Sequence, residues 1–354
     1  MAMMKLFLRP NDLKPGMIIA EDLIENNIVL ASKGTIITQP IIDKLSQIYF
    51  LNRIAVFHEE DEKKNSLIID KVKSVEEVEK SFNEFTFNVE DIFDVIDSNG
   101  IKDLEDIRAF AKKIQNELDS TRAIIKNIVL NGSGTDTIYR HSVNVAALSS
   151  ILGRWLGLDE RDINLLTYSA VLHDFGKTKI DKEILNKKGT LTPKEFHQIK
   201  NHPIASYNLI KQVPFLDSSV CYGVLMHHER LDGSGYPLGI KGEKIHEFAK
   251  IIAIADTFDA VNSNRVHRKS RGPFAALEII QKDSLGKLDY EYCKVFLDHV
   301  VNYYMGEEVL LNNDMICKII QINVNDLAHP LVLHDTEFLD LKKEPGLKVE
   351  RIVK

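Results

Sequence analysis

The doublet His227–His228 places the strongest constraint on how this chain can fold. It follows the apolar run VCYGVLM at 220–226 and precedes the loop ERLDGSGYPLGIKG, which contains four glycines. Adjacent residues of an α-helix point about 100° apart, so two neighbouring imidazoles cannot both fill one apolar face. The doublet therefore predicts a polar site at the end of a buried helix, beside a backbone that bends easily.

Other apolar segments carry polar residues in the same way. His173 and Asp174 follow the run LLTYSAVL, and Asp256 lies inside FAKIIAIADTF. His141 lies on an apolar stripe whose members recur at steps of three and four, namely Ile138, His141, Val145, Leu148, Leu152 and Trp155. Each of these polar residues, taken alone, has a purely structural explanation. It can be a hydrogen-bonded histidine of the core or a residue that ends a helix. A buried carboxylate, however, needs a cationic partner.

A fifth segment adds another histidine. Thr192, Pro193 and Glu195 form the pattern of a capping box, and we expect the helix that they open to end at His202, just before Pro203. The polar residues placed at the inner face or end of a buried helix are then His141, His173, Asp174, His202, His227, His228 and Asp256. Mixed imidazole and carboxylate ligation suits iron, manganese or zinc and disfavours calcium. Seven ligands are too many for one open catalytic ion, so they predict two ions that share a carboxylate, an arrangement suited to phosphoester hydrolysis.

The remaining pattern predicts an α+β multidomain chain. Residues 1–60 alternate short apolar runs with turn signals, which indicates a small β-rich module with one helix near 39–47. Residues 61–130 are expected to form a linker and a helical connector, and 131–306 an all-α catalytic domain. Residues 307–354 return to short β-like runs.

The connector contains an apolar seam with heptad spacing, made of Ile107, Ala111, Ile114, Leu118, Thr121, Ile125 and Ile128. Such a seam predicts either a homodimer through a helix at 101–130 or one helix packed on its own domain.

Composition excludes several classes of function. A formal net charge of -7 argues against sequence-independent binding to duplex nucleic acid. The three cysteines are widely spaced and form no CxxC pair, so we expect neither a disulfide framework nor a thiolate zinc site. The first residues lack the apolar core of a signal peptide, and no apolar run reaches membrane-spanning length. We therefore expect a cytoplasmic protein without membrane insertion.

Taken together, the motifs resemble the HD-GYP family of metal-dependent HD phosphohydrolases. They are RHS at 140–142, HDFGK at 173–177, HP at 202–203, HHERLDGSGYP at 227–237 and ADTFDAVNSNR at 255–265. The resemblance implies an all-α HD-type domain that hydrolyses cyclic di-GMP to pGpG, GMP or both, through a hydroxide that bridges two metal ions. Iron and manganese are the metals that it implies.

The resemblance also implies a role for each residue. His141, His173, Asp174 and Asp256 would hold one ion, and Asp174, as a catalytic residue, would bridge to a second ion held by His202, His227 and His228. The catalytic Lys177 would contact the scissile phosphate. The substrate contacts would be completed by Arg265 and Arg268, and by Gly235 and Tyr236 in the loop at the lip of the site.

Two positions depart from the family pattern. Trinuclear members carry a glutamate four residues before the first histidine, where this chain has Thr137, so we expect a binuclear centre. His267 replaces a common tyrosine and is interpreted as a surface replacement or an additional ligand. Alternative functions are hydrolysis of another cyclic dinucleotide, such as hybrid cyclic GMP-AMP, and nonhydrolytic sensing of a cyclic dinucleotide. A diiron oxygenase is a remote fourth interpretation.

Overall fold

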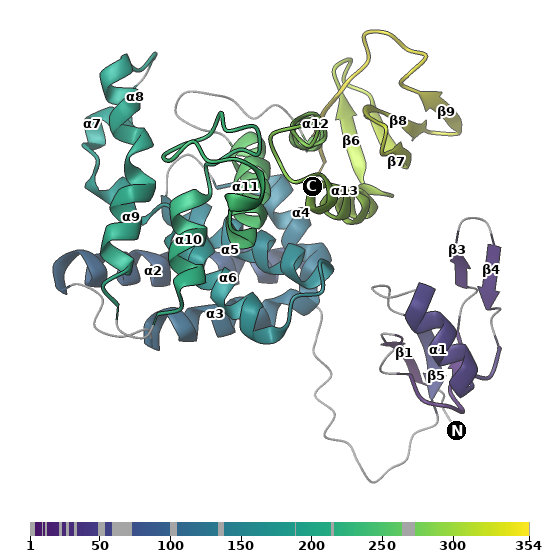
Figure 1. Ribbon diagram of the computed structural model, residues 1–354. Helices are drawn as coiled ribbons and strands as arrows, with labels where there is room; N and C mark the ends of the chain where they lie inside the picture. The colour runs from purple at the N-terminus through teal and green to yellow at the C-terminus, as the bar shows by residue number, and fades with distance from the viewer. Residues whose placement is uncertain are drawn as a thin grey trace. The chain divides into compact units, whose positions relative to one another are not determined.

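The computed structural model separates the chain into two units, Met1–Asp70 and Lys71–Lys354 (Figure 1). It describes residues 4–8, 10, 13–20, 23–25, 28–31, 34–48, 54–58, 73–99, 105–133, 138–187, 189–213, 216–263 and 273–353.

The first unit is the predicted β-rich module. Its three-stranded antiparallel sheet has the order β1-β5-β2, formed by β1 (Met4–Leu8), β5 (Ile54–His58) and β2 (Ile18–Ile19). A hairpin of β3 (Leu23–Glu25) and β4 (Ile28–Ala31) and one helix, α1 (Gln39–Ile48), complete its described elements. Ile19, Ile37 and Ile54 are fully buried at its centre. The helix lies where the sequence predicts it.

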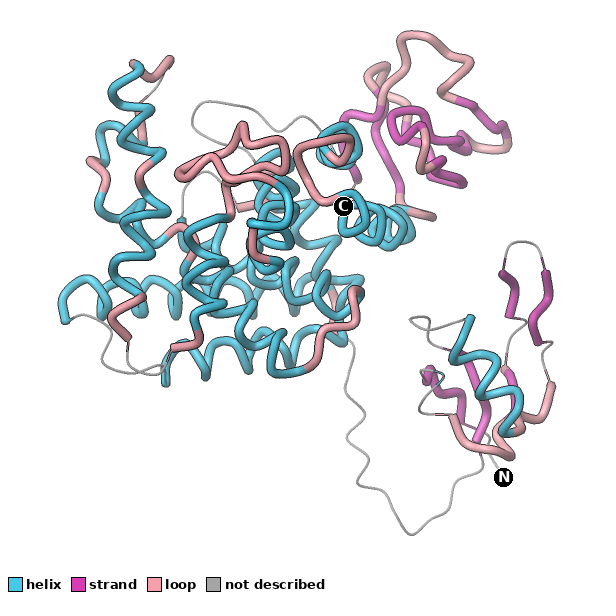
Figure 2. The backbone as a smooth tube through the Cα atoms, in the orientation of Figure 1, coloured by secondary structure: helices cyan, strands magenta, loops and turns pink. Residues whose placement is uncertain are grey.

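The second unit is mainly helical, as Figure 2 shows. Its first helices are α2 (Val75–Asn99), α3 (Glu105–Glu117), α4 (Thr121–Asn131), α5 (Ile138–Trp155), α6 (Glu160–Leu172) and α7 (Lys182–Leu185). They are followed by α8 (Pro193–Lys200), α9 (His202–Ile210), α10 (Ser218–Met226), α11 (Glu247–Asn262), α12 (Pro273–Asp283) and α13 (Tyr290–Tyr304). Short 3₁₀ turns occupy Leu118–Ser120, Phe175–Lys179 and Gly242–Lys244.

Helix α5 is the centre of this unit because every residue from Arg140 to Gly153 is buried. It packs against α2, α6 and α11. Side chains fix the starts of the helices around it, since Asp159 and Asp217 accept N–H groups at the first turns of α6 and α10. The metal-ligand candidates therefore lie on or beside helices whose positions are set by one continuous core.

A five-stranded antiparallel sheet follows the helices. Its order is β10-β6-β7-β8-β9, with β6 (Glu308–Leu311), β7 (Ile316–Asn323), β8 (Asp326–His334), β9 (Glu337–Asp340) and β10 (Val349–Ile352). Alternate residues of β7, among them Cys317 and Ile319, are buried, and β8 and β10 pack on α12. The predicted α+β class, with a helical domain between two β-rich parts, is confirmed.

The apolar seam of the connector is divided between two helices. The turn Leu118–Ser120 separates α3 from α4, so the seam does not form one straight helix. All of its members except Thr121 are buried within the chain's own core. Burying the seam therefore does not require a homodimer.

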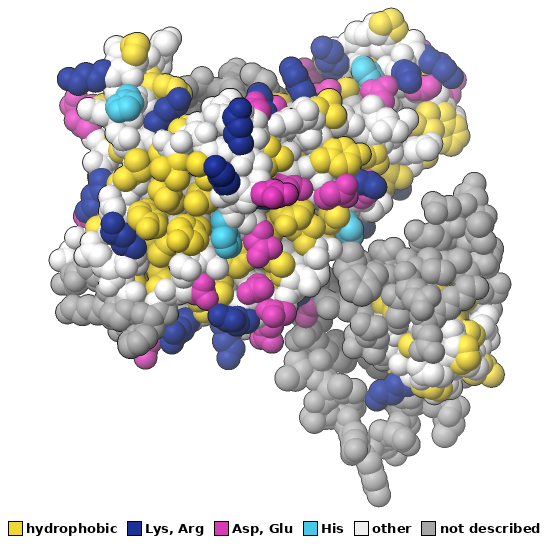
Figure 3. Space-filling model, viewed as in Figure 1, with side chains coloured by type: hydrophobic (Ala, Val, Ile, Leu, Met, Phe, Trp, Pro, Cys, Tyr) yellow, Lys and Arg dark blue, Asp and Glu magenta, His cyan; other side chains and the backbone are white. Residues whose placement is uncertain are grey.

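The face seen in Figure 3 exposes a group of hydrophobic side chains over α9 and α10. Ile204 and Tyr222 are exposed hydrophobic residues of these two helices. Among the described residues, no helix is both long enough and apolar enough to cross a membrane.

Candidate metal centre

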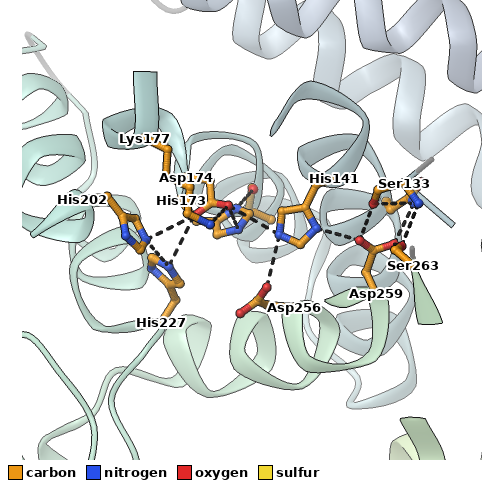
Figure 4. A network of polar contacts seen from close by, with 12 residues as sticks. Ser133, His141, His173, Asp174, Lys177, His202, His227, Asp256, Asp259 and Ser263 are labelled. Carbon is orange, nitrogen blue, oxygen red and sulfur yellow. Dashed lines mark hydrogen bonds and ion pairs between the residues drawn. The ribbon is translucent and has the colours of Figure 1, made fainter. Parts of the chain in front are cut away.

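Three helices and two turns bring all seven predicted ligands together. His141 lies on α5 and Asp256 on α11, whereas the others occupy helix ends: His173 and Asp174 after α6, His202 at the start of α9, and His227 and His228 after α10. Their ligand atoms form two groups, within each of which all atoms lie within 4.8 Å of one another. The first group is His141, His173 and Asp256, and the second is Asp174, His202, His227 and His228. Figure 4 labels the members of both groups other than His228.

Hydrogen bonds orient the histidines toward a common centre. The Nδ1 atoms of His173, His202 and His227 lie 2.6–2.7 Å from the carbonyl oxygen three residues earlier in the chain. A carbonyl oxygen only accepts, so each Nδ1 carries the proton and each Nε2 keeps its lone pair. This is the arrangement in which proteins present histidine to a metal ion.

Unpaired polar atoms show that the site fits metal ions. The Nε2 atom of His173 and Oδ1 of Asp174 are buried without a partner in hydrogen-bonding geometry. The Nε2 atoms of His202 and His227 face each other at 3.2 Å, and with both Nδ1 atoms protonated neither can donate. Lone pairs buried face to face are unfavourable unless a cation lies between them. The donor set therefore fits divalent ions held by nitrogen and oxygen.

The charge states also suit metal binding. Burial alone would raise the pKa of Asp174, but Lys177, whose Nζ lies 2.5 Å from its Oδ2, and the nearby histidines hold that pKa well below its usual value. Burial lowers the pKa of His173 to about 4, and burial also lowers the pKa of His227 and His228 well below its ordinary value. At neutral pH the carboxylate is ionised and these three imidazoles are neutral, as ligands must be.

His141 differs from these three histidines. Burial would lower its pKa, but the carboxylates of Asp256 and Asp259 outweigh burial and raise the pKa to about 9. Its Nε2 lies 3.1 Å from Oδ1 of Asp256, and its Nδ1 lies 2.6 Å from Oδ2 of Asp259. An ion bound by His141 must displace a proton from Nε2.

Asp259 is a positioning residue to which sequence reasoning assigned no role. It is fully buried, one helical turn after Asp256, and its Oδ1 accepts a hydrogen bond of 2.7 Å from Nδ2 of Asn144. Ser133 also donates its hydroxyl to this carboxylate. The network fixes the ring of His141 from the side opposite the centre (Figure 4). The only signal in the sequence was its spacing of three from Asp256, which places both carboxylates on one helix face.

The centre is open on one side. The side chains of Lys177, His228 and Asp256 are 17%, 15% and 11% exposed, whereas those of the other ligands are almost completely buried. Lys177 is brought there by a close approach of its turn to α9, because a Cβ on Gly176 would lie 2.2 Å from the carbonyl oxygen of His202. The structure thus places the predicted phosphate-binding lysine at the open edge.

The glycine-rich loop folds back against His228. A Cβ on Gly235 would lie 2.5 Å from the carbonyl oxygen of His228, so this close approach requires glycine. The ring of Tyr236 lies over the His228 imidazole, with 4.6 Å between centroids. Gly235 and Tyr236 are thus beside a ligand at the open edge, and their substrate contacts stay predictions.

Glu229 holds this loop in place, and sequence reasoning missed it. Its buried carboxylate accepts N–H groups from Leu238, Gly239 and Ile240 at 2.6–3.2 Å. No local pattern indicated this contact, because its partners lie nine to eleven residues ahead.

Three further predictions concern a helix start, a helix end and a set of residues near the site, and their outcomes differ. The capping box of Thr192 and Glu195 is present. The prediction that His202 ends this helix was wrong: α8 ends at Lys200 and His202 begins α9. Proline is tolerated in a first helical turn, so Pro203 continues the new helix rather than following its end. Thr137, Arg265, His267 and Arg268 lie outside the described residues.

Comparison with known proteins gives concordant matches. Residues 107–291, about half of the chain, match a family model described as an HD domain. The chain is 33% identical over 192 residues to the cyclic di-GMP phosphodiesterase PdeB of Borreliella burgdorferi, covering 54% of this chain and 50% of the relative. It is 35% identical over 189 residues to the 3'3'-cGAMP-specific phosphodiesterase 1 of Vibrio cholerae, covering 53% and 43%.

Among solved structures, the chain is similar to Bd1817, an HDG"Y"P protein from Bdellovibrio bacteriovorus. The TM-score is 0.53 at 17% identity, over 83% of this chain and 98% of the other. This match supports the fold. The chain spans about half the length of the curated relatives that it matches.

Proposed function

Because the chain belongs to the HD-domain family, we propose that it is a metal-dependent phosphodiesterase that hydrolyses cyclic di-GMP to pGpG, GMP or both. The matches confirm the resemblance to HD-GYP proteins that the motifs indicated. The substrate rests on the relatives, one of which is named as a cyclic di-GMP phosphodiesterase.

The observation that carries the proposal is the pair of ligand groups joined at Asp174. Its Oδ1 lies 3.1 Å from Nε2 of His202, and its Oδ2 lies 3.5 Å from Nε2 of both His141 and His173. A carboxylate that faces both groups supports two ions rather than one. The nitrogen and oxygen donors suit iron or manganese, and we propose one of these metals. Bound by these residues, such ions would supply positive charge that activates water and offsets the charge of a phosphate group.

The chain's own groups prepare this chemistry. Lys177, at the open edge, can donate to a phosphate oxygen and offset its charge. Among the described residues of the site, Lys177, His228 and Asp256 have the most exposed side chains, so water can reach the centre at the edge that they form. The ionised state of Asp174 and the neutral state of His173 mean that these ligands need no change of protonation when metal binds.

A second candidate substrate is the hybrid cyclic GMP-AMP. A specific observation favours it, since one relative of comparable identity is named as specific for 3'3'-cGAMP. The choice between the two substrates rests on the names of these relatives.

The test is anaerobic turnover of both cyclic dinucleotides in one metal-loaded preparation. We expect loss of cyclic di-GMP, with close to two iron or manganese ions per chain and pGpG appearing before GMP. Faster loss of cyclic GMP-AMP would move the assignment to the hybrid messenger. A reduced, fully metallated sample that consumes neither substrate would reject the phosphodiesterase and leave the sensor.

A further inference from the structure

We propose that Lys200 is a further substrate-binding residue, which holds the second phosphodiester of a cyclic dinucleotide while the metal centre takes the first. The inference rests on the proposed function and deepens it. Lys200 is the last residue of α8, two residues before His202.

The position of Lys200 follows from the open edge of the centre. His228 forms part of that edge, and Tyr236 covers it with a ring-to-ring distance of 4.6 Å. The Nζ of Lys200 lies 5.1 Å from the centroid of the Tyr236 ring. The ammonium group of Lys200 therefore lies against a tyrosine that itself lies against the metal ligand His228.

The charge of Lys200 lacks an anionic partner within the described part of the chain. Lys177, at the edge of the centre, is paired with Asp174, and Lys187 is paired with Glu195, which lies on the same helix as Lys200. Lys200 instead lies over two aromatic rings, since its Nζ is also 4.8 Å from the centroid of Phe196. Ring faces attract a cation without consuming its N–H donors, so three donors stay available for a ligand.

The substrate supplies the matching anion. A cyclic dinucleotide carries two phosphodiesters, and the metal centre with Lys177 can engage only the one being cleaved. A compact ammonium group pairs best with an anionic oxygen, so the second phosphodiester is the group that Lys200 is suited to bind. Because this phosphodiester is not cleaved, the contact contributes equally to the bound substrate and the transition state.

The experiment compares two substrates in the metal-loaded full chain. Cyclic di-GMP has two phosphodiesters, and bis(p-nitrophenyl) phosphate has one. For Lys200→Gln we expect KM for cyclic di-GMP to rise about tenfold with kcat nearly unchanged, since a hydrogen bond to a charged group is lost. Both constants for bis(p-nitrophenyl) phosphate should stay as in the wild type. Lys200→Arg should recover most of the affinity.

A matched control is available on the next helix. Lys211 places its Nζ 5.2 Å from the ring centroid of Tyr207, the same kind of contact away from the centre. Lys211→Gln therefore removes an equal charge from above a single tyrosine ring, and we expect it to leave the kinetics of both substrates unaffected. Calorimetric binding of cyclic di-GMP to the metal-depleted chain gives a readout independent of turnover, and Lys200→Gln should weaken it.

Three outcomes would overturn the proposal. An unchanged KM and affinity for cyclic di-GMP would show that Lys200 does not bind the substrate. An equal loss of kcat on both substrates would show that it acts on the metal centre. A wild type that hydrolyses only bis(p-nitrophenyl) phosphate would reject the proposed function and with it this role of Lys200.

Discussion

The two halves of the metal centre are built from different parts of helices. The second half, Asp174, His202, His227 and His228, lies entirely at helix ends. The first half contains His141 and Asp256, which lie inside two long buried helices, α5 and α11. Helix-end ligands depend on local turns, whereas helix-interior ligands depend on how whole helices pack.

The same difference appears in the groups that hold the histidines. His202 and His227, like His173 in the first half, bond to backbone carbonyls three residues away, which no substitution removes. His141 is held by the side chain of Asp259, which is 118 residues away in the chain. The first half should therefore be the more sensitive to mutations outside the ligand set.

The largest effect is expected where the two halves meet. Asp174 faces both groups, so Asp174→Ala should lower bound metal to near zero and reduce turnover by at least about a thousandfold. The measurement is metal content per chain together with cyclic di-GMP hydrolysis. Asp217→Ala is the control: it removes the N-cap of α10, should cost about 1 kcal/mol of stability and should leave metal bound. One ion retained by Asp174→Ala would show that the halves are independent.

Single ligands should separate the halves. His173→Ala should remove the ion of the first half and His227→Ala that of the second, each leaving one ion per chain. Turnover should fall by about a hundredfold or more in both variants, since neither half alone clamps attacking and leaving oxygens. Metal counting on variants whose thermal unfolding is cooperative provides the measurement. Loss of both ions from either variant would contradict a division into two groups.

Protonation gives a third way to compare the histidines, using the metal-free protein. The pKa of His173 falls from 6.5 to about 4 on folding, so the unfolded state binds more protons and stability is lost as pH falls from 6.5 to 4. The pKa of His141 rises to about 9, so its contribution is fully present below 6.5 and is lost as pH rises to 9. The contribution of each of these two histidines amounts to about 3 kcal/mol.

Urea unfolding in chelator at a series of pH values measures both limbs, with a maximum expected near pH 6.5. His141→Gln should remove the alkaline limb. His173→Gln should reduce the acid limb only in part, since the pKa values of His227 and His228 are lowered too. An alkaline limb that persists in His141→Gln would show that Asp256 and Asp259 do not hold a proton on that ring.

The sequence revealed the second half more completely than the network behind the first. Polar residues that end apolar runs, as Asp174 and His227 do, are a local signal. The contact between Asp259 and His141 is tertiary, and no local pattern could indicate which buried side chain would meet which. His202 shows the limit of local reasoning even at a helix end, because a proline both follows helices and occupies their first turns.

The smallest effect that we expect concerns this tertiary contact. Asp259→Asn keeps the shape of the side chain but removes the charge that holds the Nδ1 proton of His141. The dissociation constant of the first-half ion should rise about tenfold to a hundredfold, while the second-half ion is unaffected. The pKa of His141 in the metal-free protein should fall, since one of its two carboxylate partners is neutralised.

A stepwise metal titration resolves the two affinities, and NMR of the metal-free imidazole follows the pKa. Asn262→Ala is the control on the same helix: it removes a buried hydrogen bond to the carbonyl of Ile128 without touching the centre. It should lower stability and leave both affinities unchanged. If Asp259→Asn weakened both ions equally, α11 would support the centre as a whole and the contrast between side-chain and backbone anchoring would not hold. If only the first ion weakened, a residue outside the ligand set would control the occupancy of one half.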